Sequence, residues 1–431
     1  MKRKLYWMLV FLLGSVLISE MPLSRNEGLV LQAEFRPFRA LINLFKKKEK
    51  AVIEAKTVKE KTVDDFMNEA IADSAWPGGV LTLTDTGKTL YSKAYGYHTY
   101  SKKEATLVDD IFDLASVSKV LGTTSAVMLL YDQGLIDLDA YVVNYIPEFA
   151  GPNPEQSILK RTVKIRHLLT HTSGLPAYRQ FWKMGDSIEA RVDSIFQTAL
   201  DTIPGTKMVY SCIGFITLAK VVERITEMPM DIFLEKNLFQ PLGMKNTMYN
   251  PKPELWPRVV PTEFNELNKK LTRGHVHDEV ARSIGGVSGN AGLFSAGEDL
   301  AIFARMMLNE GIHDGDTIIQ PATVKLFTKK ANVIYGDSRG LGWDTPEGRS
   351  SGGWYISDKA FGHTGFTGTS LWIDTENKLA VILLTNAVHP SRTWKAPKYF
   401  HWRQKIHSEA YRWAGFTREN SHLEKYDRWK E

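Results

Sequence analysis

The sequence predicts an α+β protein in which helices flank one antiparallel sheet and a helical subdomain is inserted into the chain. Alternating residues at Val80–Thr84 and Thr89–Tyr97, joined across Asp85–Lys88, indicate a hairpin near the start of the folded part. Two more strand patterns lie late in the chain, at Gly368–Asp374 and Leu379–Thr385. Because helical patterns fill the middle, strands from both ends are expected to form one sheet around an inserted helical subdomain.

Apolar periodicity and end-capping residues define the expected helices. Ser295–Glu298 has the pattern of a capping box that opens a helix ending near Gly311. Gly134 is expected to cap the helix that carries Ser116. The other expected helices are Asp64–Ala75, the Ser116 helix up to Gln133, Ile165–Thr170, Ile188–Leu200, Gly214–Thr226, Asp231–Leu238 and Tyr399–Trp413.

The N-terminus has the features of an export signal. Three basic residues, Lys2 to Lys4, precede the apolar run Leu5–Ile18. This run is short for a membrane span, which favours a signal peptide over residues 1–20, and a retained signal anchor is the alternative. The protein is therefore predicted to be exported, to the periplasm or another extracytoplasmic place.

Charge separates the N-terminal segment from the folded part. Residues 1–62 contain 13 Lys and Arg against 6 Asp and Glu, whereas the rest of the 431-residue chain contains 41 against 43. Residues 21–62 are interpreted as a basic linker. The alternative is a segment that lies on anionic lipid headgroups and associates the protein with a membrane. The folded body is expected at 63–415 and a charged tail at 416–431.

Composition excludes several classes of function. The near-neutral body has no basic patch, so no nucleic-acid partner is expected. Cys212 is the only cysteine, which rules out an intramolecular disulfide. His275, His277, Asp278 and Glu279 resemble a metal-ligand cluster, but histidines two residues apart converge only in a strand or tight loop. We therefore predict no metal and no other cofactor.

Ser116 and Lys119 are the first candidates for catalysis, because residues three apart share one face of a helix. A serine hydroxyl becomes a nucleophile when a neighbouring base takes its proton, and a lysine with a depressed pKa can be that base. The first turn of a helix also offers free N–H groups to an oxyanion. The alternative is an ordinary polar helix start with an exposed lysine.

Two further stretches favour the catalytic interpretation of Ser116 and Lys119 over an ordinary helix start. Tyr210 lies just before the Gly214 helix, where a phenol can relay a proton for a serine–lysine pair, although a core tyrosine is the alternative. Gly362–Gly368 leads into a strand, and its small residues allow a substrate backbone to lie along a sheet edge. The alternative for this stretch is a glycine-rich turn.

Together these motifs resemble the class C-like serine β-lactamases, the penicillin-binding proteins and related esterases and amidases, in particular cell-wall amidase-like members. Three ordered motifs carry the resemblance over about residues 63–415: Ser116-x-x-Lys119, Tyr210-Ser211-Cys212 and His363-Thr364-Gly365. The segments Leu168–Pro176 and Gly134–Asp139 support it. The resemblance implies a β-lactamase/transpeptidase-like fold.

The resemblance also implies roles for single residues. Ser116 would form an acyl-enzyme, Lys119 and Tyr210 would manage its proton, and the N–H groups of Ser116 and Phe366 would form the oxyanion hole. His363, with Thr364 and Gly365, would line a wall that binds substrate. The segment containing His277, followed by Gly285–Ser295, resembles a cleft wall of cell-wall-associated members, with a structural loop as the alternative.

Cys212 departs from the family pattern, which usually has asparagine at this position. A thiol replaces poorly an amide that can bind both the lysine and a substrate amide. Efficient turnover of penicillins is therefore not expected. Cys212 itself is interpreted as a small buried hydrophobic residue at the substrate-binding site, with a second nucleophile as the alternative.

The predicted function is hydrolysis, through an acyl-enzyme, of amide bonds in peptidoglycan-derived fragments, with a small-molecule or muropeptide substrate. One alternative is a broad-specificity carboxylesterase. Another is a penicillin-binding sensor that is acylated without turnover, which Cys212 would favour.

Overall fold

The computed structural model describes residues 61–425, apart from positions 186, 266–268, 335–338 and 396. The predicted signal segment 1–20 lies outside the described residues, as does nearly all of the predicted linker. Within the described ranges, no helix is both long and apolar enough to cross a membrane.

The predicted succession of strands and helices is present. The helices are α3 Val63–Ala72, α4 Ser125–Asp132, α5 Pro154–Lys160, α6 Ile165–Leu169, α7 Ile188–Phe196, α8 Cys212–Thr226, α9 Met230–Leu234, α10 Gln240–Leu242, α11 Glu279–Ser283, α12 Gly297–Leu308, α13 Pro321–Thr328 and α14 Lys398–Trp413. The strands are β1 Gly78–Thr84, β2 Thr89–Gly96, β3 Phe112–Asp113, β4 Met248–Tyr249, β5 Phe264–Asn265, β6 Lys270–Leu271, β7 Leu293–Ser295, β8 Ile312–His313, β9 Asp316–Thr317, β10 Ala360–Thr364, β11 Ser370–Asp374 and β12 Leu379–Thr385.

Strands from both ends of the chain form one antiparallel sheet, as the sequence predicts. Its order is β10-β11-β12-β1-β2, so the C-terminal strands pair with the N-terminal hairpin across β12 and β1. Val80 lies opposite Leu384 in this register, and Leu83 lies opposite Val381. β10, which carries His363, is an edge strand of the sheet.

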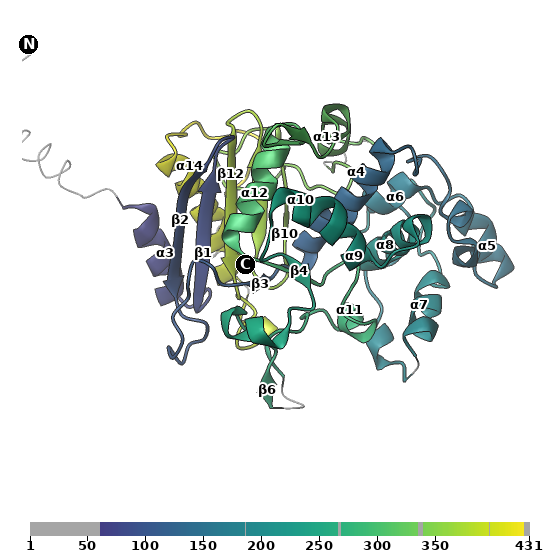
Figure 1. The fold of residues 1–431 in the computed structure, drawn as a ribbon, viewed down its shortest axis with the longest axis horizontal. Coiled ribbons are helices and arrows are strands. Elements are labelled where there is room, and N and C mark those ends of the chain that lie inside the picture. The colour runs from purple at the N-terminus through teal and green to yellow at the C-terminus, as the bar shows by residue number, and fades with distance from the viewer. Residues whose placement is uncertain (1–60, 186, 266–268, 335–338, 396, 426–431) are drawn as a thin grey trace, which may run out of the picture. The chain divides into compact units, whose positions relative to one another are not determined.

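Both faces of the sheet are covered (Figure 1). Leu81 and Leu83 of β1 pack with α3 and α14, whereas Val80 packs in the large core that includes α12. Successive residues of a strand point to opposite faces, so a strand covered on both sides is continuously apolar. Leu379–Leu384 of β12 meets this condition, since every residue there is buried.

The helical subdomain lies beside the sheet and is built around α4, α6 and α8 (Figure 1). Apolar side chains of these helices, such as Met128, Leu168 and Leu218, are fully buried in one core with the α12 side of the sheet. The segment that carries Ser116 lies where the two parts meet, because it follows β3 directly and contacts β10 of the sheet and α8 of the subdomain.

The predicted start of the helix after β7 is wrong in one detail. The proposed capping box at Ser295 does not form, because Ser295 ends β7 and its hydroxyl pairs with that of Thr247 at 2.7 Å. Ala296 is the N-cap of α12, and its side chain has no polar atom for capping. Glu298 instead accepts hydrogen bonds from Thr89 and Arg305.

The folded part also extends beyond the predicted boundary at residue 415. Asn420 donates its backbone N–H to the Trp354 carbonyl at 2.7 Å, and Glu424 donates to Gly348 at 2.8 Å. Residues 416–425 therefore pack on the body, and 426–431 lie outside the described residues.

Candidate active site

The segment that carries Ser116 is helical but not a regular α-helix. Ala115–Val117 forms a 3₁₀ turn, Lys119–Thr124 is π-helical, and α4 continues from Ser125. The sequence predicts a single α-helix up to Gln133, so this part of the prediction is wrong. Single π-helical turns are costly and concentrate at functional sites, where they redirect side chains.

Asp113 holds the turn in front of the nucleophile. Ala115 has φ +46°, a left-handed conformation that a non-glycine residue adopts only when its surroundings enforce it. Its N–H donates to Oδ1 of Asp113 at 2.8 Å, while Oδ2 accepts the N–H of His277 at 2.6 Å. Burial raises the pKa of Asp113, and the two backbone donors oppose that rise. One buried carboxyl group thus fixes both the Ser116 turn and the His277 segment.

Lys119 lies beside Ser116, as their spacing predicts. Its ammonium nitrogen Nζ is 3.1 Å from Ser116 Oγ, 2.9 Å from the Asn290 carbonyl oxygen and 3.5 Å from Cys212 Sγ. The side chain is fully buried. Burial alone would depress its pKa, but Coulombic attraction to Cys212 and Tyr210 outweighs burial and leaves the pKa raised. We expected a depressed pKa, and the direction found is the opposite, so Lys119 is a cation and hydrogen-bond donor in this structure.

Tyr210 is surrounded by cationic and imidazole groups. Lys119 Nζ lies 5.0 Å from its ring centroid, and the Arg339 guanidinium carbon lies 5.4 Å away. The rings of His171 and His363 lie 4.4 and 5.9 Å from it. The ring of Tyr210 therefore lies against two cations, and a hydrogen bond to Tyr210 contributes to the raised pKa of Lys119.

His363 is buried behind Tyr210, with 3% of its surface exposed. Its Nδ1 contacts the Thr364 carbonyl at 2.8 Å, and its Nε2 has no hydrogen-bond partner among the described residues. Burial, together with the positive charges of Arg339 and Lys119, lowers its pKa well below the usual value. The imidazole is therefore neutral near pH 7 and does not present a positive charge to a substrate.

The turn after β10 is bound tightly to the nucleophile segment. Thr367 Oγ1 donates to the Asp113 carbonyl at 2.7 Å, and Thr369 Oγ1 donates to that of Leu114 at 2.9 Å. A Cβ atom at Gly365 would lie 2.3 Å from the Leu114 carbonyl oxygen. Glycine is thus required at this position because the two backbones approach closely. This turn brings Phe366 next to Ser116.

Five of the predicted site residues line one pocket of about 310 Å³: Ser116, Tyr210, Cys212, His277 and Phe366. Lys119 contacts the pocket residues from beneath, through Ser116 and Cys212. His363, Thr364 and Gly365 were predicted to line a substrate-binding wall, but they are not among the described residues that line this pocket. The pocket thus joins four segments that are distant in sequence around the serine hydroxyl.

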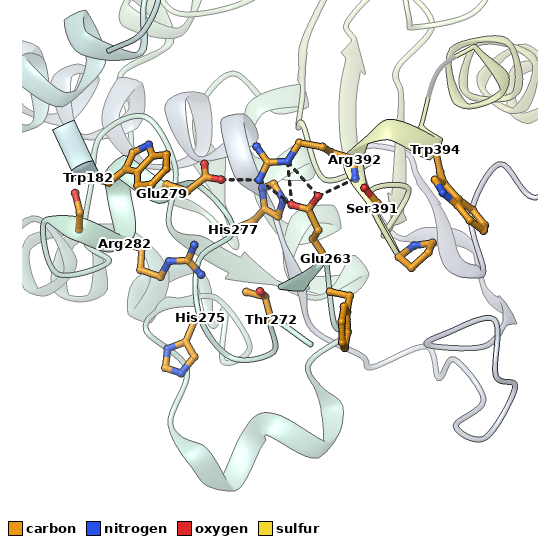
Figure 2. A pocket seen from close by; sticks show the side chains of 13 residues that line it. Trp182, Glu263, Thr272, His275, His277, Glu279, Arg282, Ser391, Arg392 and Trp394 are labelled. Atoms are coloured by element: carbon orange, nitrogen blue, oxygen red, sulfur yellow. Dashed lines mark hydrogen bonds and ion pairs between the residues drawn. The ribbon is translucent and has the colours of Figure 1, made fainter. Parts of the chain in front are cut away.

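His277 belongs to an ionic wall of this pocket, and Figure 2 shows that wall as part of the larger groove beside it. Its Nε2 lies 3.0 Å from Glu263, and Glu263 accepts from Nε and NH2 of Arg392 at 2.9 and 2.7 Å. Arg392 also donates to Glu279. Hydrogen bonds from His277 and Arg392 outweigh burial and hold the pKa of Glu263 at about 2. In the described part of the chain, no cluster of three or more His, Cys, Asp or Glu has a metal-binding arrangement.

Sequence reasoning missed four residues of the site: Asp113, His171, Arg339 and Lys395. His171 lies in the family-like stretch Leu168–Pro176, but no role was assigned to it. Lys395 donates to the Phe366 carbonyl and lies 4.3 Å from its ring. None of these residues stands in a catalytic motif, so only the fold identifies them.

Comparisons with known proteins agree with this arrangement. A family model for beta-lactamases matches residues 61–403. The chain is 33% identical over 365 residues to an N-acetylmuramyl-L-alanine amidase of Bacillus subtilis (strain 168), which covers 77% of this chain and 82% of the relative. It is 32% identical over 348 residues, 74% of this chain and 80% of the relative, to a protein of Salmonella typhimurium provisionally named a D-alanyl-D-alanine carboxypeptidase. The solved structure of EstCE1, a hydrolase with promiscuous acyltransferase activity, shares the fold with a TM-score of 0.64 at 21% identity, over 81% of this chain and 97% of that one.

Proposed function

The chain belongs to the beta-lactamase family of hydrolases, and we propose that it cleaves amide bonds in peptidoglycan fragments through an acyl-enzyme on Ser116. The family and the β-lactamase/transpeptidase-like fold predicted from the sequence are confirmed. The residue roles, the substrate and the location are part of the proposal.

The observation that carries the proposal is the contact of 3.1 Å between Lys119 Nζ and Ser116 Oγ at the base of a pocket. Because the pKa of Lys119 is raised, its ammonium donates to the serine oxygen in the resting state. Tyr210, as the phenolate hydrogen-bonded to Lys119, is then the group that takes the Ser116 proton and becomes the neutral phenol.

The chemical steps follow from this arrangement. Ser116 Oγ attacks the carbonyl carbon of the substrate, and the oxyanion that forms is bound by the N–H groups of Ser116 and Phe366. The C–N bond breaks, and the departing amine takes up the proton held at Tyr210. Water then attacks the carbonyl carbon of the Ser116 ester and gives a proton to Tyr210. Tyr210 passes this proton to Ser116 Oγ as the C–O bond breaks, which releases the acid and restores the serine.

The amide substrate class rests on the relatives and on the pocket. A relative 33% identical over most of its length is named for cleaving the muramyl–L-alanine bond, and a second is provisionally named for a bond between D-alanines. The neutral, buried His363 offers no cation to the carboxylate of a β-lactam. Cys212 also lacks the amide that could bind a β-lactam carbonyl. We therefore propose poor β-lactam turnover.

Export is proposed on the basis of residues 1–20 and the location of such substrates. Peptidoglycan is extracytoplasmic, and the predicted signal would bring the enzyme to it. Association with a membrane through the basic segment 21–62 remains part of this proposal.

Hydrolysis assays with three substrates test the function. Purified protein is incubated with muropeptides, with short-chain nitrophenyl esters and with a chromogenic cephalosporin, and mass spectrometry identifies the products. We expect a muropeptide to lose an amide bond. Rapid ester cleavage without any muropeptide product would support a carboxylesterase instead, and lasting acylation by cephalosporin without turnover would support a sensor.

A further inference from the structure

The catalytic pocket opens into a larger groove of about 1130 Å³ (Figure 2). Trp182, His277, Glu279 and Arg392 line both, so the two spaces are continuous. The catalytic pocket alone, at about 310 Å³, is at the lower end of the range for small-ligand sites. A small ester or β-lactam therefore leaves the groove empty, whereas an extended substrate enters it.

Most of the charge in the groove is already neutralised by internal pairs. Glu263 accepts hydrogen bonds from His277 and Arg392, and Glu279 accepts one from Arg392. Both carboxylates of this wall therefore share the single guanidinium of Arg392. Arg392 is held by these contacts and is not free to pair with a ligand.

Arg282 differs from this wall. It lies near the end of α11, is exposed and lines the groove. Its guanidinium forms no hydrogen bond or ion pair with any described residue. In Figure 2 the side chain extends into the space between Glu279 and His275. Its charge is thus available to an anionic group in the groove.

Two indole rings bound the same space. Trp182 and Trp394 lie on opposite sides of the groove, with 37% and 56% of their surfaces exposed. Flat aromatic faces of this kind bind the apolar faces of sugars and of peptide side chains. Aromatic walls and one unmatched guanidinium fit an extended ligand that carries a carboxylate.

We propose that the groove binds the part of the substrate beyond the scissile bond, and that Arg282 pairs there with a free carboxylate of a peptidyl-saccharide. The inference rests on the proposed function, because it assigns the groove to the same substrate. Arg282 acts in selection and leaves the chemistry at Ser116 unchanged.

Binding to a chemically inactive enzyme separates selection from catalysis. In Ser116→Ala protein, calorimetry compares a disaccharide-pentapeptide muropeptide with the same compound after amidation of its carboxyl groups. The free carboxylate form is expected to bind about tenfold more tightly, the difference that one charge-assisted hydrogen bond supplies. Ser116→Ala/Arg282→Gln should lose this preference. Ser116→Ala/Arg161→Gln is the matched control, since Arg161 is exposed and lies outside both spaces.

The outcomes distinguish the inference from the proposed function. An equal affinity for both ligands, no binding of either, or an unchanged preference in Ser116→Ala/Arg282→Gln protein would overturn the role of Arg282. Equal muropeptide cleavage by wild-type and Arg282→Gln protein would also overturn the role of Arg282 and would leave the proposed function intact. Binding that depends on Arg282, without cleavage by wild-type protein, would overturn the proposed function alone.

Discussion

Replacing Cys212 with asparagine, the residue that the family usually has at this position, should make the site more active toward amide substrates. An ammonium has three N–H donors, and those of Lys119 contact Ser116 Oγ, the Asn290 carbonyl and Cys212 Sγ. The contact to sulfur, at 3.5 Å, is the weakest of the three. Cys212 is the first residue of α8 and borders the pocket, so an asparagine has room to turn its amide toward both lysine and substrate.

The size of the effect follows from the kind of bond that is gained. A hydrogen bond to a charged group contributes about 1.5–3 kcal/mol, whereas sulfur is a weak acceptor. Side-chain ordering offsets part of this gain. A net gain of about 1.4 kcal/mol in the transition state corresponds to a rate increase of about tenfold. We therefore expect Cys212→Asn to raise kcat/KM for amide substrates about tenfold, and to speed acylation by a cephalosporin.

The assay compares three variants on a muropeptide and on a nitrophenyl ester. Cys212→Ser and Cys212→Ala, which keep the position small, are the controls and should stay close to wild-type activity. Intact-protein mass spectrometry measures the rate of cephalosporin acylation. If Cys212→Ser removes activity and Cys212→Asn does not restore it, the thiol itself takes part in the chemistry and the reasoning fails.

Four further predictions concern single features. Lys119→Ala should lower hydrolysis nearly as far as loss of the nucleophile does, because the two act as a unit, and activity within about tenfold of wild type would contradict this. Gly365→Ala should slow ester and amide hydrolysis alike, since its Cβ would clash with Leu114 and Thr369, while Gly185→Ala, with open space around it, should not. Burial, aided by Arg403, lowers the pKa of Lys395 from 10.5 to about 7. Between pH of about 7 and 10.5, Lys395 is protonated in the unfolded chain but neutral in the folded one. The contribution of Lys395 to the free energy of unfolding should therefore increase as the pH rises through this range. Chemical denaturation of Lys395→Met protein should show a smaller gain; an unchanged profile would refute the assignment. A purified chain starting at residue 57 should be soluble and active. Full-length protein should be exported, whereas protein that lacks residues 1–20 should stay in the cytosol, as measured by cell fractionation.

The sheet and the central contact could be predicted from the sequence because both depend on local patterns. Alternation at Val80–Thr84 and a continuous apolar run at Leu379–Thr385 identified strands that pair in the structure. The spacing of Ser116 and Lys119 identified a contact that does not depend on the type of helix between them. The order of the motifs also assigned Tyr210, Cys212 and Phe366 to the site, and in the structure they line one pocket with Ser116.

What could not be predicted depends on contacts between distant segments. Asp113 fixes the nucleophile turn through bonds to Ala115 and His277, and no periodicity reveals a buried carboxyl group with that task. The raised pKa of Lys119 likewise arises from neighbours that folding supplies. From the sequence, His363 was predicted to line the substrate cleft, but in the structure it packs against Tyr210 and is buried.

The proposed mechanism depends most directly on a covalent bond to Ser116. Protein incubated with a fluorophosphonate, or rapidly quenched during muropeptide hydrolysis, is digested, and mass spectrometry locates the added mass. The mechanism predicts one adduct, on the peptide containing Ser116, and none in Ser116→Ala protein. An adduct on Cys212, or hydrolysis by Ser116→Ala protein at a rate close to that of wild type, would contradict it.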